Sequence, residues 1–375
     1  MTTITWCDVG SEGDGMSAGI SRLSWVREQA ADLNRDARTV AGAALRRRRG
    51  PFAQQLRRVR PHLDIPPLPA AGGVWAIAMV KNESDIIDST VRHLLEQGVE
   101  NFLVMDNGSD DDTLEILRGL EQEIPGFHVG IDSEPAHYQG AKMTALADAV
   151  RRAGATWVIP FDADEYWYGV DATLVEVLSR TRASVVEAII HNVYPATDGG
   201  WQVDDQPQHL SKVAFRAHPF ATMGEGNHDV ARPGAWSTEL RILHVSWRSY
   251  AQFSRKLRGG AEALELTDLP DSMGGHWRLG GRLGDSQLRE QWGRLAQGAL
   301  PELGWTPRGP FAGCRPSGPI SGPHLTSRMS ARPHPPTASI DWTSFSRELN
   351  PSPRHRHHRR TQWRAHDRRT ARSTC

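Results

Sequence analysis

The stretch of sequence that decides the fold is WVIPFDADE, at residues 157–165. Its first five residues are apolar without interruption, which is typical of a strand that is buried on both faces of a parallel sheet. The strand runs directly into Asp162, Asp164 and Glu165. Since ligands of parallel α/β sheets bind beyond the carboxyl ends of the strands, the stretch predicts a buried strand with a polar site at its end.

Strands and helices alternate in the sequence before this stretch. Four strands and three helices within about 90 residues predict a parallel, right-handed sheet. The expected fold class is therefore α/β, with a mostly parallel sheet flanked by helices. The expected strands are residues 74–80, 102–105, 127–131 and 157–161, and the expected helices are residues 84–97, 114–120 and 139–153.

The second half of the sequence, up to about residue 292, carries shorter strand signals mixed with Gly and Pro. Apolar runs predict strands at residues 185–190, 212–216 and 239–245, and helical spacing predicts a helix at residues 250–264. We expect this half to complete the sheet and to build the other side of the site.

Three parts of the chain differ in composition. Residues 1–73 predict a helical N-terminal extension, because apolar residues recur at helical spacing before a linker rich in Pro and Gly at residues 61–73. Residues 74–300 are the expected main domain. Residues 301–375 are rich in Pro, Ser, Arg and His without apolar periodicity, so we expect a disordered basic tail.

Bulk composition excludes several classes of protein. Lys plus Arg and Asp plus Glu both total 44, so the net charge gives no reason to expect a nucleic acid partner. Cys7, Cys314 and Cys375 form neither a disulfide framework nor a zinc-type spacing, which favours the reducing cytoplasm. The sequence has no run of about 18 apolar residues, so no transmembrane segment is expected. The four arginines at residues 46–49 leave two interpretations open, a solvated helix end or peripheral attachment to an anionic membrane.

Asp162 and Asp164 are the first candidates for a chemical role. In an extended segment, residues two apart face the same way, so these two carboxylates can converge on one cation. Mg²⁺ or Mn²⁺ takes carboxylate oxygens and keeps positions for the oxygens of a diphosphate. Aspartates with this spacing are also common in solvated turns, but their place after a buried strand favours a divalent metal site.

A second candidate site is VMDNGSDDDT, at residues 104–113. A strand, a Gly-containing turn and a helix opened by capping groups account for Gly108, Ser109 and Asp111 without any ligand. They do not account for Asp106, which lies at the end of the strand, where a carboxylate can accept hydrogen bonds from a nucleobase or a ribose. We therefore expect Asp106 to bind a nucleotide and Asp111 to cap the helix.

These segments, together with residues 80–83, resemble the family 2 glycosyltransferases of the GT-A fold. The resemblance covers about residues 74–167, a quarter of the chain, and consists of four motifs in the same order. Asn107 departs from the pattern, since many members have a second Asp there. The matching text is VKNE (80–83), HLLEQGV (93–99), DNGSDDDT (106–113) and WVIPFDADE (157–165).

The resemblance implies a GT-A-like fold and a nucleotide-sugar donor. It implies that Glu83 and Asp106 lie near the nucleoside, and that Asp162 and Asp164 lie at the metal and the diphosphate. The implied cofactor is a divalent metal, Mn²⁺ or Mg²⁺. Lys81 lies at the same strand end as Glu83, so we group it with the residues that bind the nucleotide sugar.

The catalytic base and the third metal ligand are expected in the second half. An inverting transferase needs a carboxylate that takes the proton of the acceptor hydroxyl, and Glu225 and Asp229 are the nearest candidates in sequence order. His244 is the candidate metal ligand, because imidazole suits Mn²⁺, and His228 is a further candidate. A turn or surface position is the alternative for each carboxylate, and a structural role is the alternative for each histidine. Four further cations either steer phosphates or form the solvated face of a helix: Arg248, Arg255, Lys256 and Arg258.

The expected function is transfer of a sugar from a nucleotide-sugar donor to an acceptor, with inversion and with a divalent metal. The sequence leaves the acceptor open among glycans, lipids and proteins. One alternative is a catalytically silent carbohydrate-binding or scaffold protein on the same fold. Another is a nucleotidyltransferase, although its usual Gly-rich phosphate loop does not follow residue 80.

Overall fold

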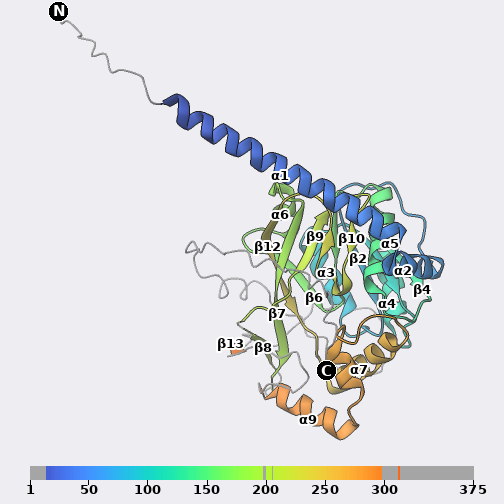
Figure 1. Ribbon diagram of the computed structural model, residues 1–375. Helices are drawn as coiled ribbons and strands as arrows, with labels where there is room; N and C mark the ends of the chain where they lie inside the picture. Colours follow the sequence, from blue (N-terminus) through green and yellow to red (C-terminus); the bar gives the residue numbers. More distant parts are fainter. Residues whose placement is uncertain (1–13, 197–199, 205, 298–310, 313–375) are drawn as a thin grey trace, which may run out of the picture. The chain divides into compact units, whose positions relative to one another are not determined.

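The structure is a computed structural model, and it describes residues 14–196, 200–204, 206–297 and 311–312 (Figure 1). Within these residues, eleven strands form one sheet and two short strands form a second one. In chain order the strands are β1 (Leu63–Asp64), β2 (Val74–Val80), β3 (Asn101–Asp106), β4 (Phe127–Asp132), β5 (Trp157–Pro160), β6 (Glu165–Gly169), β7 (Val185–Pro195), β8 (Trp201–Asp204), β9 (Lys212–Arg216), β10 (Thr222–Met223), β11 (Val230–Ala231), β12 (Trp236–His244) and β13 (Phe311–Ala312).

Helices pack against the large sheet, as the α/β prediction requires (Figure 1). The α-helices are α1 (Asp14–Arg48), α2 (Pro51–Val59), α3 (Ile87–Glu96), α4 (Thr113–Glu123), α5 (Gln139–Ala153), α6 (Leu174–Arg180), α7 (Tyr250–Glu265), α8 (Gly275–Gly281) and α9 (Asp285–Ala296), and the 3-10 helices are η1 (Arg60–His62) and η2 (Glu225–Asn227).

The order of strands in the large sheet is β1-β4-β3-β2-β5-β9-β7-β12-β6, with β8 on β7 and β13 on β8. Strands β4, β3, β2 and β5 are parallel to one another, which confirms the parallel arrangement predicted from the alternation of elements. Strand β7 is parallel to β12, whereas β9 and β6 run antiparallel to their neighbours. The sheet is therefore mostly parallel and GT-A-like, as expected.

The core lies between the parallel strands and α5. Trp75 and Ile77 on β2 are fully buried in one cluster with Leu146 on α5 and Phe215 on β9. Removal of such large side chains from water contributes about 1.5–3 kcal/mol each. Helix α5 ends at Gly154, whose φ of +111° lies in the left-handed region that glycine adopts without strain.

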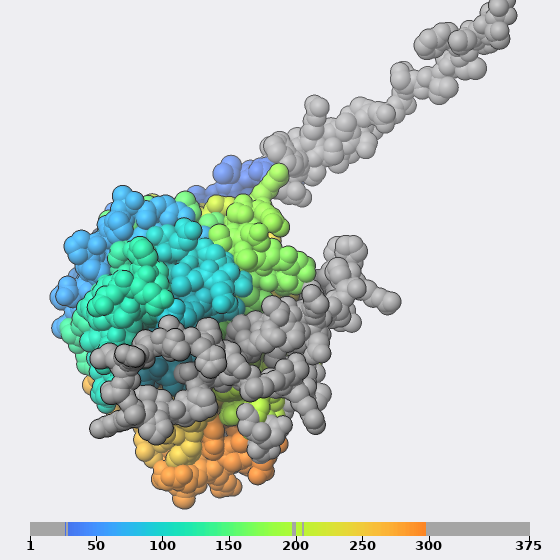
Figure 2. All heavy atoms as spheres, turned by 180° about the vertical axis from the view of Figure 1, so that it is seen from behind, coloured from blue at the N-terminus to red at the C-terminus, as the bar shows by residue number. Residues whose placement is uncertain are grey.

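Helices α3 and α4 cover one face of the parallel strands, the face seen in Figure 2 (light blue to turquoise). Arg92 on α3 pairs with Asp88 on the same helix at 3.0 Å and with Glu123 at the end of α4 at 2.8 Å. Their inward sides bury Val91 and Leu117. The helices that the spacing of apolar residues predicts at residues 84–97 and 114–120 therefore correspond to α3 and α4.

Helix α2 and the C-terminal end of α1 pack on the main domain, whereas the earlier part of α1 projects from it (Figure 1). Helix α2 buries Phe52, Leu56 and Val59 in one cluster with Tyr138 and Ala141. Arg47 pairs with Asp148 on α5, and Arg58 pairs with Glu134 at 2.8 Å. These contacts fix the extension against α5 and the loop before it.

The segment expected to be a linker, residues 61–73, contains the edge strand β1. Leu63 lies opposite Asp132 of β4 in an antiparallel pair. Leu63, Ile65 and Leu68 also pack against the main hydrophobic cluster. Prolines exclude a long α-helix here but tolerate the short 3-10 helix η1 and an edge strand, so the composition predicted the lack of a long helix and missed the pairing.

Several further elements of the second half were not predicted from the sequence, because short strands and helices give weak periodicity. They are β6, β8, β10, β11, α6, α8 and α9. The predicted basic tail lies outside the described residues, apart from the two residues of β13, which pair with β8. Among the residues searched, no helix is both long and apolar enough to cross a membrane.

Candidate active site at the strand ends

Asp106 is the last residue of β3, and it lies opposite Val80 of β2 and Ile131 of β4. Its side chain is buried. Oδ2 accepts the backbone N–H groups of Gly108 and Ser109, both at 3.1 Å, across a turn that Gly108 enters with a φ of +67°. Oδ1 is buried and has no hydrogen-bond partner among the described residues. One acceptor of this carboxylate is thus fixed by the turn, and the other is available.

Asn107 turns away from Asp106 into a buried network on the far side of β3. Its Nδ2 donates to Asp132 Oδ2 at 2.9 Å and to the backbone oxygen of Glu134 at 2.9 Å. Lys142 on α5 donates to the same two groups, each at 2.6 Å. The residue that departs from the family pattern is therefore a structural amide.

Asp111 has the structural role that the sequence predicts. It accepts the backbone N–H of Thr113 at 3.0 Å, at the start of α4, and the hydroxyl of Ser84 at 2.8 Å. Burial raises the pKa of Asp111, but its hydrogen bonds from Thr113 and Ser84 outweigh this and lower it. It therefore ties the loops after β2 and β3 together.

The acidic segment after β5 turns instead of continuing as an extended strand. The N–H of Glu165 donates to the backbone oxygen of Asp162 at 3.0 Å. Asp162 Oδ1 accepts from Gln139 and Asn227, both at 3.1 Å, and Oδ2 contacts Lys212 Nζ at 2.5 Å. The extended conformation that we expected is thus not observed, and the turn gives Asp162 and Asp164 different partners.

Asp164 is almost completely buried and is surrounded by cations. Its Oδ2 contacts Lys256 Nζ at 2.5 Å, with Arg248 Nη1 at 3.9 Å, and its Oδ1 lies 3.6 Å from His244 Nε2. His244 reaches this place because β12 pairs with β6, where it lies opposite Glu165. Burial alone would raise the pKa of Asp164, but Lys256, His244 and Arg248 hold it well below its ordinary value.

Glu83, at the end of β2, joins the same group of charges. It pairs with Arg248 and, at 3.1 Å, with Lys256 Nζ. Arg248 also contacts Asp85 at 2.8 Å, and only 8% of its side chain is exposed. Of the four cations around α7, Arg248 and Lys256 thus face the acids, whereas Arg255 is largely solvated.

Lys212 was not predicted as a site residue, although a lysine that opens an apolar strand is a detectable signal. It lies at the start of β9 and is 4% exposed, with Glu165 Oε1 at 2.8 Å in addition to Asp162. Burial lowers the pKa of this ammonium, but Asp162 and Glu165 outweigh burial and raise it. Gln139 and Asn227 carried no sequence signal, because their role depends on the meeting of α5 and η2 at Asp162.

Of the two candidate bases, the structure brings only Glu225 to the buried part of the site. Its Oε2 accepts the N–H of Gly140 in the first turn of α5 at 3.1 Å, and burial raises its pKa. Gln139 bridges this loop to Asp162 by accepting the N–H of Gly226 at 3.0 Å. Asp229 is exposed.

The remaining candidates lie apart from these contacts. His228 Nδ1 lies 2.9 Å from the backbone oxygen of Ser211, and burial lowers its pKa to about 4. Lys81 is exposed, and no ion pair joins it to the described site residues. Across the described residues, no group of three or more His, Cys, Asp and Glu side chains is arranged to hold a metal ion. Asp164 and His244 are thus a pair of potential ligands, not a complete metal site.

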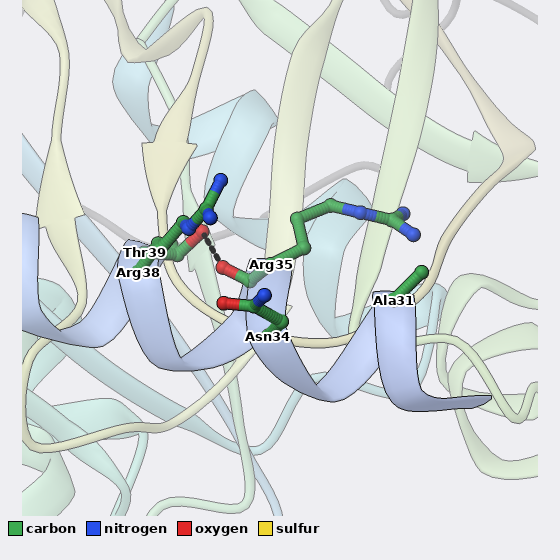
Figure 3. A pocket seen from close by; sticks show the side chains of 5 residues that line it. All are labelled: Ala31, Asn34, Arg35, Arg38 and Thr39. Atoms are coloured by element: carbon green, nitrogen blue, oxygen red, sulfur yellow. Dashed lines mark hydrogen bonds between the residues drawn. The ribbon is translucent and has the colours of Figure 1, made fainter. Parts of the chain in front are cut away.

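A separate groove lies along α1 (Figure 3). It is lined by Ala31, Asn34, Arg35, Arg38 and Thr39, and the Thr39 hydroxyl donates to the backbone oxygen of Arg35 at 3.0 Å. None of its lining residues belongs to the strand-end site.

The model of the family described as Glycosyl transferase family 2 matches residues 75–236, which include Asp106, Asp162 and Asp164. No curated protein matches the chain.

Three solved structures are similar to the chain at low identity. TarS from S. aureus in complex with UDP is 15% identical, with 55% of this chain and 69% of that chain covered and a TM-score of 0.32. The mannosyltransferase PcManGT from Pyrobaculum calidifontis, in complex with GDP-Man and Mn²⁺, is 14% identical, with coverages of 71% and 85% and a TM-score of 0.34. GalNAc-T7 with UDP, GalNAc and Mn²⁺ is 12% identical, with coverages of 59% and 54% and a TM-score of 0.34. The glycosyl transferase family 2 model thus matches residues 75–236 of the chain, which lie on a GT-A-like sheet, and this match supports a glycosyltransferase.

Proposed function

We propose that the protein transfers a sugar from a nucleotide-sugar donor to an acceptor hydroxyl with inversion, and that a divalent cation assists the departure of the diphosphate. The main support for a donor site is that Asp106 Oδ1 is a buried acceptor without a hydrogen-bond partner among the described residues. An unsatisfied buried group of this kind costs about 1–3 kcal/mol. A nucleobase N–H or a ribose O–H that donates to Oδ1 would recover this cost.

The closeness of Asp164 and His244 supports the proposal that a divalent cation binds there. Oδ1 and Nε2 lie 3.6 Å apart, and oxygen and imidazole ligands both suit Mn²⁺. Mg²⁺ and Mn²⁺ are often bound by one or two protein groups together with phosphate oxygens and water, so a pair of ligands fits a cation that arrives with the donor. Asp162 stays a predicted ligand, with 30% of its side chain exposed. The bound cation would neutralise the charge that develops on the leaving diphosphate.

Glu225 is the proposed base. A base must be unprotonated at working pH yet basic enough to take a proton, and a raised pKa moves Glu225 toward that range. The acceptor oxygen forms a bond to the anomeric carbon while its proton passes to Glu225. The bond between the anomeric carbon and the diphosphate oxygen breaks, and the nucleoside diphosphate leaves with the electron pair.

A panel of nucleotide sugars tests this function. Release of the nucleoside diphosphate with Mn²⁺ present should identify at least one donor, and calorimetry should show binding of its nucleoside diphosphate. Asp106→Ala should weaken that binding by about tenfold, the equivalent of about 1.4 kcal/mol. A purified, folded chain that binds no nucleotide and releases none from any donor would exclude the proposal.

Attachment to an anionic membrane is a second part of the proposal, and exposed arginines support it. Arg46, Arg48, Arg49 and Arg57 are exposed at the junction of α1 and α2. The apolar side of α2 is buried, so the attraction would be electrostatic and would weaken with salt. Flotation with vesicles that contain anionic lipid, at low and high salt, tests it. Flotation that salt does not reduce, or no flotation at low salt, would contradict it.

A further inference from the structure

Lys256 lies where the two acidic strand ends meet. Its Nζ contacts Asp164 Oδ2 at 2.5 Å and Glu83 Oε1 at 3.1 Å. The residue belongs to α7, beyond the segment matched by the family model. The two carboxylates that contact this ammonium favour its charged form.

The charges around Lys256 do not balance. Ion pairs form two groups here, and each has one carboxylate more than it has cations. One group joins three carboxylates to Arg248 and Lys256, and the other joins two carboxylates to Lys212. One divalent cation would neutralise the excess of acid, but the charge of a donor diphosphate would then have no counterpart. A cation of the protein that moved from its carboxylates to the diphosphate would place positive charge beside that group. The five acids, referred to below as the acidic cluster, are Glu83, Asp85, Asp162, Asp164 and Glu165, and the cations are Lys212, Arg248 and Lys256.

Lys256 is the cation best placed to leave. Lys212 is 4% exposed between two carboxylates, and Arg248 is 8% exposed and also donates to the backbone oxygen of Val245 at 3.2 Å. Lys256 is 24% exposed, and its ammonium sits on a flexible four-carbon stem.

The contact of Lys256 with Asp164 also favours Lys256 as the cation that moves. Lys256 contacts Oδ2, while the proposed cation would bind Oδ1 beside His244. An ammonium and a divalent cation on the two oxygens of one carboxylate repel each other.

We propose that Lys256 is an exchangeable counter-ion. It neutralises Asp164 before the donor binds, and it moves to the diphosphate of the donor when a divalent cation takes Asp164. This inference rests on the proposed function, and it makes the binding of metal and of nucleoside diphosphate mutually dependent. Lys256 thereby becomes a residue that contacts the leaving group.

Mn²⁺ binding to Lys256→Met tests the exchange, with Arg258→Met as the matched control. Arg258 lies on the same helix, is 45% exposed and pairs only distantly with Asp285, at 3.9 Å. With the competing ammonium removed, Lys256→Met should bind Mn²⁺ alone about tenfold more tightly than the wild type. It should bind the nucleoside diphosphate in the presence of Mn²⁺ about tenfold more weakly, because a charge-assisted contact is lost. Arg258→Met should match the wild type in both titrations.

Lysine NMR of the wild-type protein gives a second measurement that does not depend on the folding of a variant. The chain has four lysines, Lys81, Lys142, Lys212 and Lys256, so isotope-labelled lysine side chains give few signals. Mg²⁺ should shift the signal of Lys256, and the nucleoside diphosphate should shift it again. Lys142, which is held by Asp132 and the Glu134 backbone, should not respond.

The possible outcomes separate this inference from the proposed function. If the wild type binds Mn²⁺ and nucleoside diphosphate but the Lys256 signal does not move, or if folded Lys256→Met binds Mn²⁺ no more tightly, the counter-ion role is excluded and the donor site stands. If the wild type binds neither Mn²⁺ nor nucleoside diphosphate, the counter-ion role and the proposed function are both excluded.

Discussion

Two regions of the chain meet at the site, and they bring opposite charges to it. Residues 83–165, at the ends of the strands from β2 to β6, supply all five members of the acidic cluster. Residues 212–256 supply the three cations that pair with them. The acidic region carries the sequence motifs, whereas the cations are scattered along β9, α7 and the loop before it. The comparison shows that sequence motifs can specify the acids of a site, whereas the cations that pair with them lie in segments without a recognisable motif.

The largest expected effect comes from the acidic region. Asp164→Ala should lower turnover of the donor by about a thousandfold, because it removes the proposed cation ligand and leaves Lys256 and Arg248 without their shared acceptor. Steady-state release of nucleoside diphosphate measures this. Asp171→Ala, an exposed acid after β6, is the control and should leave turnover unchanged. Comparable turnover in both variants would show that the acidic region is not the reactive one.

The next largest effect is expected at Lys212, the most deeply buried of the three cations that pair with the acidic cluster. Lys212→Met should lower the free energy of unfolding by about 3–5 kcal/mol, because it leaves the fully buried carboxylate of Glu165 without its cation and removes the cation of the partly exposed Asp162. Urea denaturation measures this loss. Adding Glu165→Gln to Lys212→Met should restore part of it, whereas a double variant no more stable than Lys212→Met would argue against the pairing.

A smaller effect separates the two candidate bases. Glu225→Gln should lower kcat/KM by about a hundredfold, while Asp229→Asn, an exposed control, should retain wild-type activity. Burial raises the pKa of Glu225, and the base acts only when deprotonated. Wild-type activity should therefore be present above that raised pKa and be lost as the pH falls through it. A pH profile whose acidic limb persists unchanged in Glu225→Gln would assign the base elsewhere.

The smallest effect tests whether Asn107 belongs to the structural network. Asn107→Asp should lower the free energy of unfolding by about 1–3 kcal/mol, because it replaces two donated hydrogen bonds with repulsion from Asp132. Thermal and urea unfolding measure the change. Asn101→Asp, whose amide makes only long contacts at 3.4 and 3.5 Å, is the matched control. A variant as stable as the wild type would mean that the second acid found in many family members is tolerated here as well.

The sequence predicts the parallel half of the sheet well, because strands buried on both faces are uninterrupted apolar runs. The expected strand at residues 74–80 and helix at residues 139–153 agree with the bounds of β2 and α5. The turn at Asp162 was missed, since one hydrogen bond between Glu165 and Asp162 decides it and residue spacing cannot show it.

In the candidate site, too, the sequence predicts some residues, whereas other contacts appear only in the folded chain. Asp106 and Asp164 stand out because carboxylates at the ends of buried strands need an explanation. The proximity of His244 to Asp164 depends on the register of β12 on β6, a strand that the sequence did not predict. Lys212 and Lys256 pair with acids that lie 50 and 92 positions earlier in the chain, so only the folded chain shows the pairing.

The edge strand β1 has a consequence for how the protein behaves among other copies of itself. An open edge of a sheet can recruit strands from neighbouring molecules and seed aggregation. Here two residues of the extension occupy the outer edge of β4, and Pro66 and Pro67 follow after Ile65. Proline lacks the N–H that a further strand would need, so pairing cannot continue beyond this point. The extension therefore covers the outer edge of β4 and leaves little backbone there for a strand of another copy to pair with.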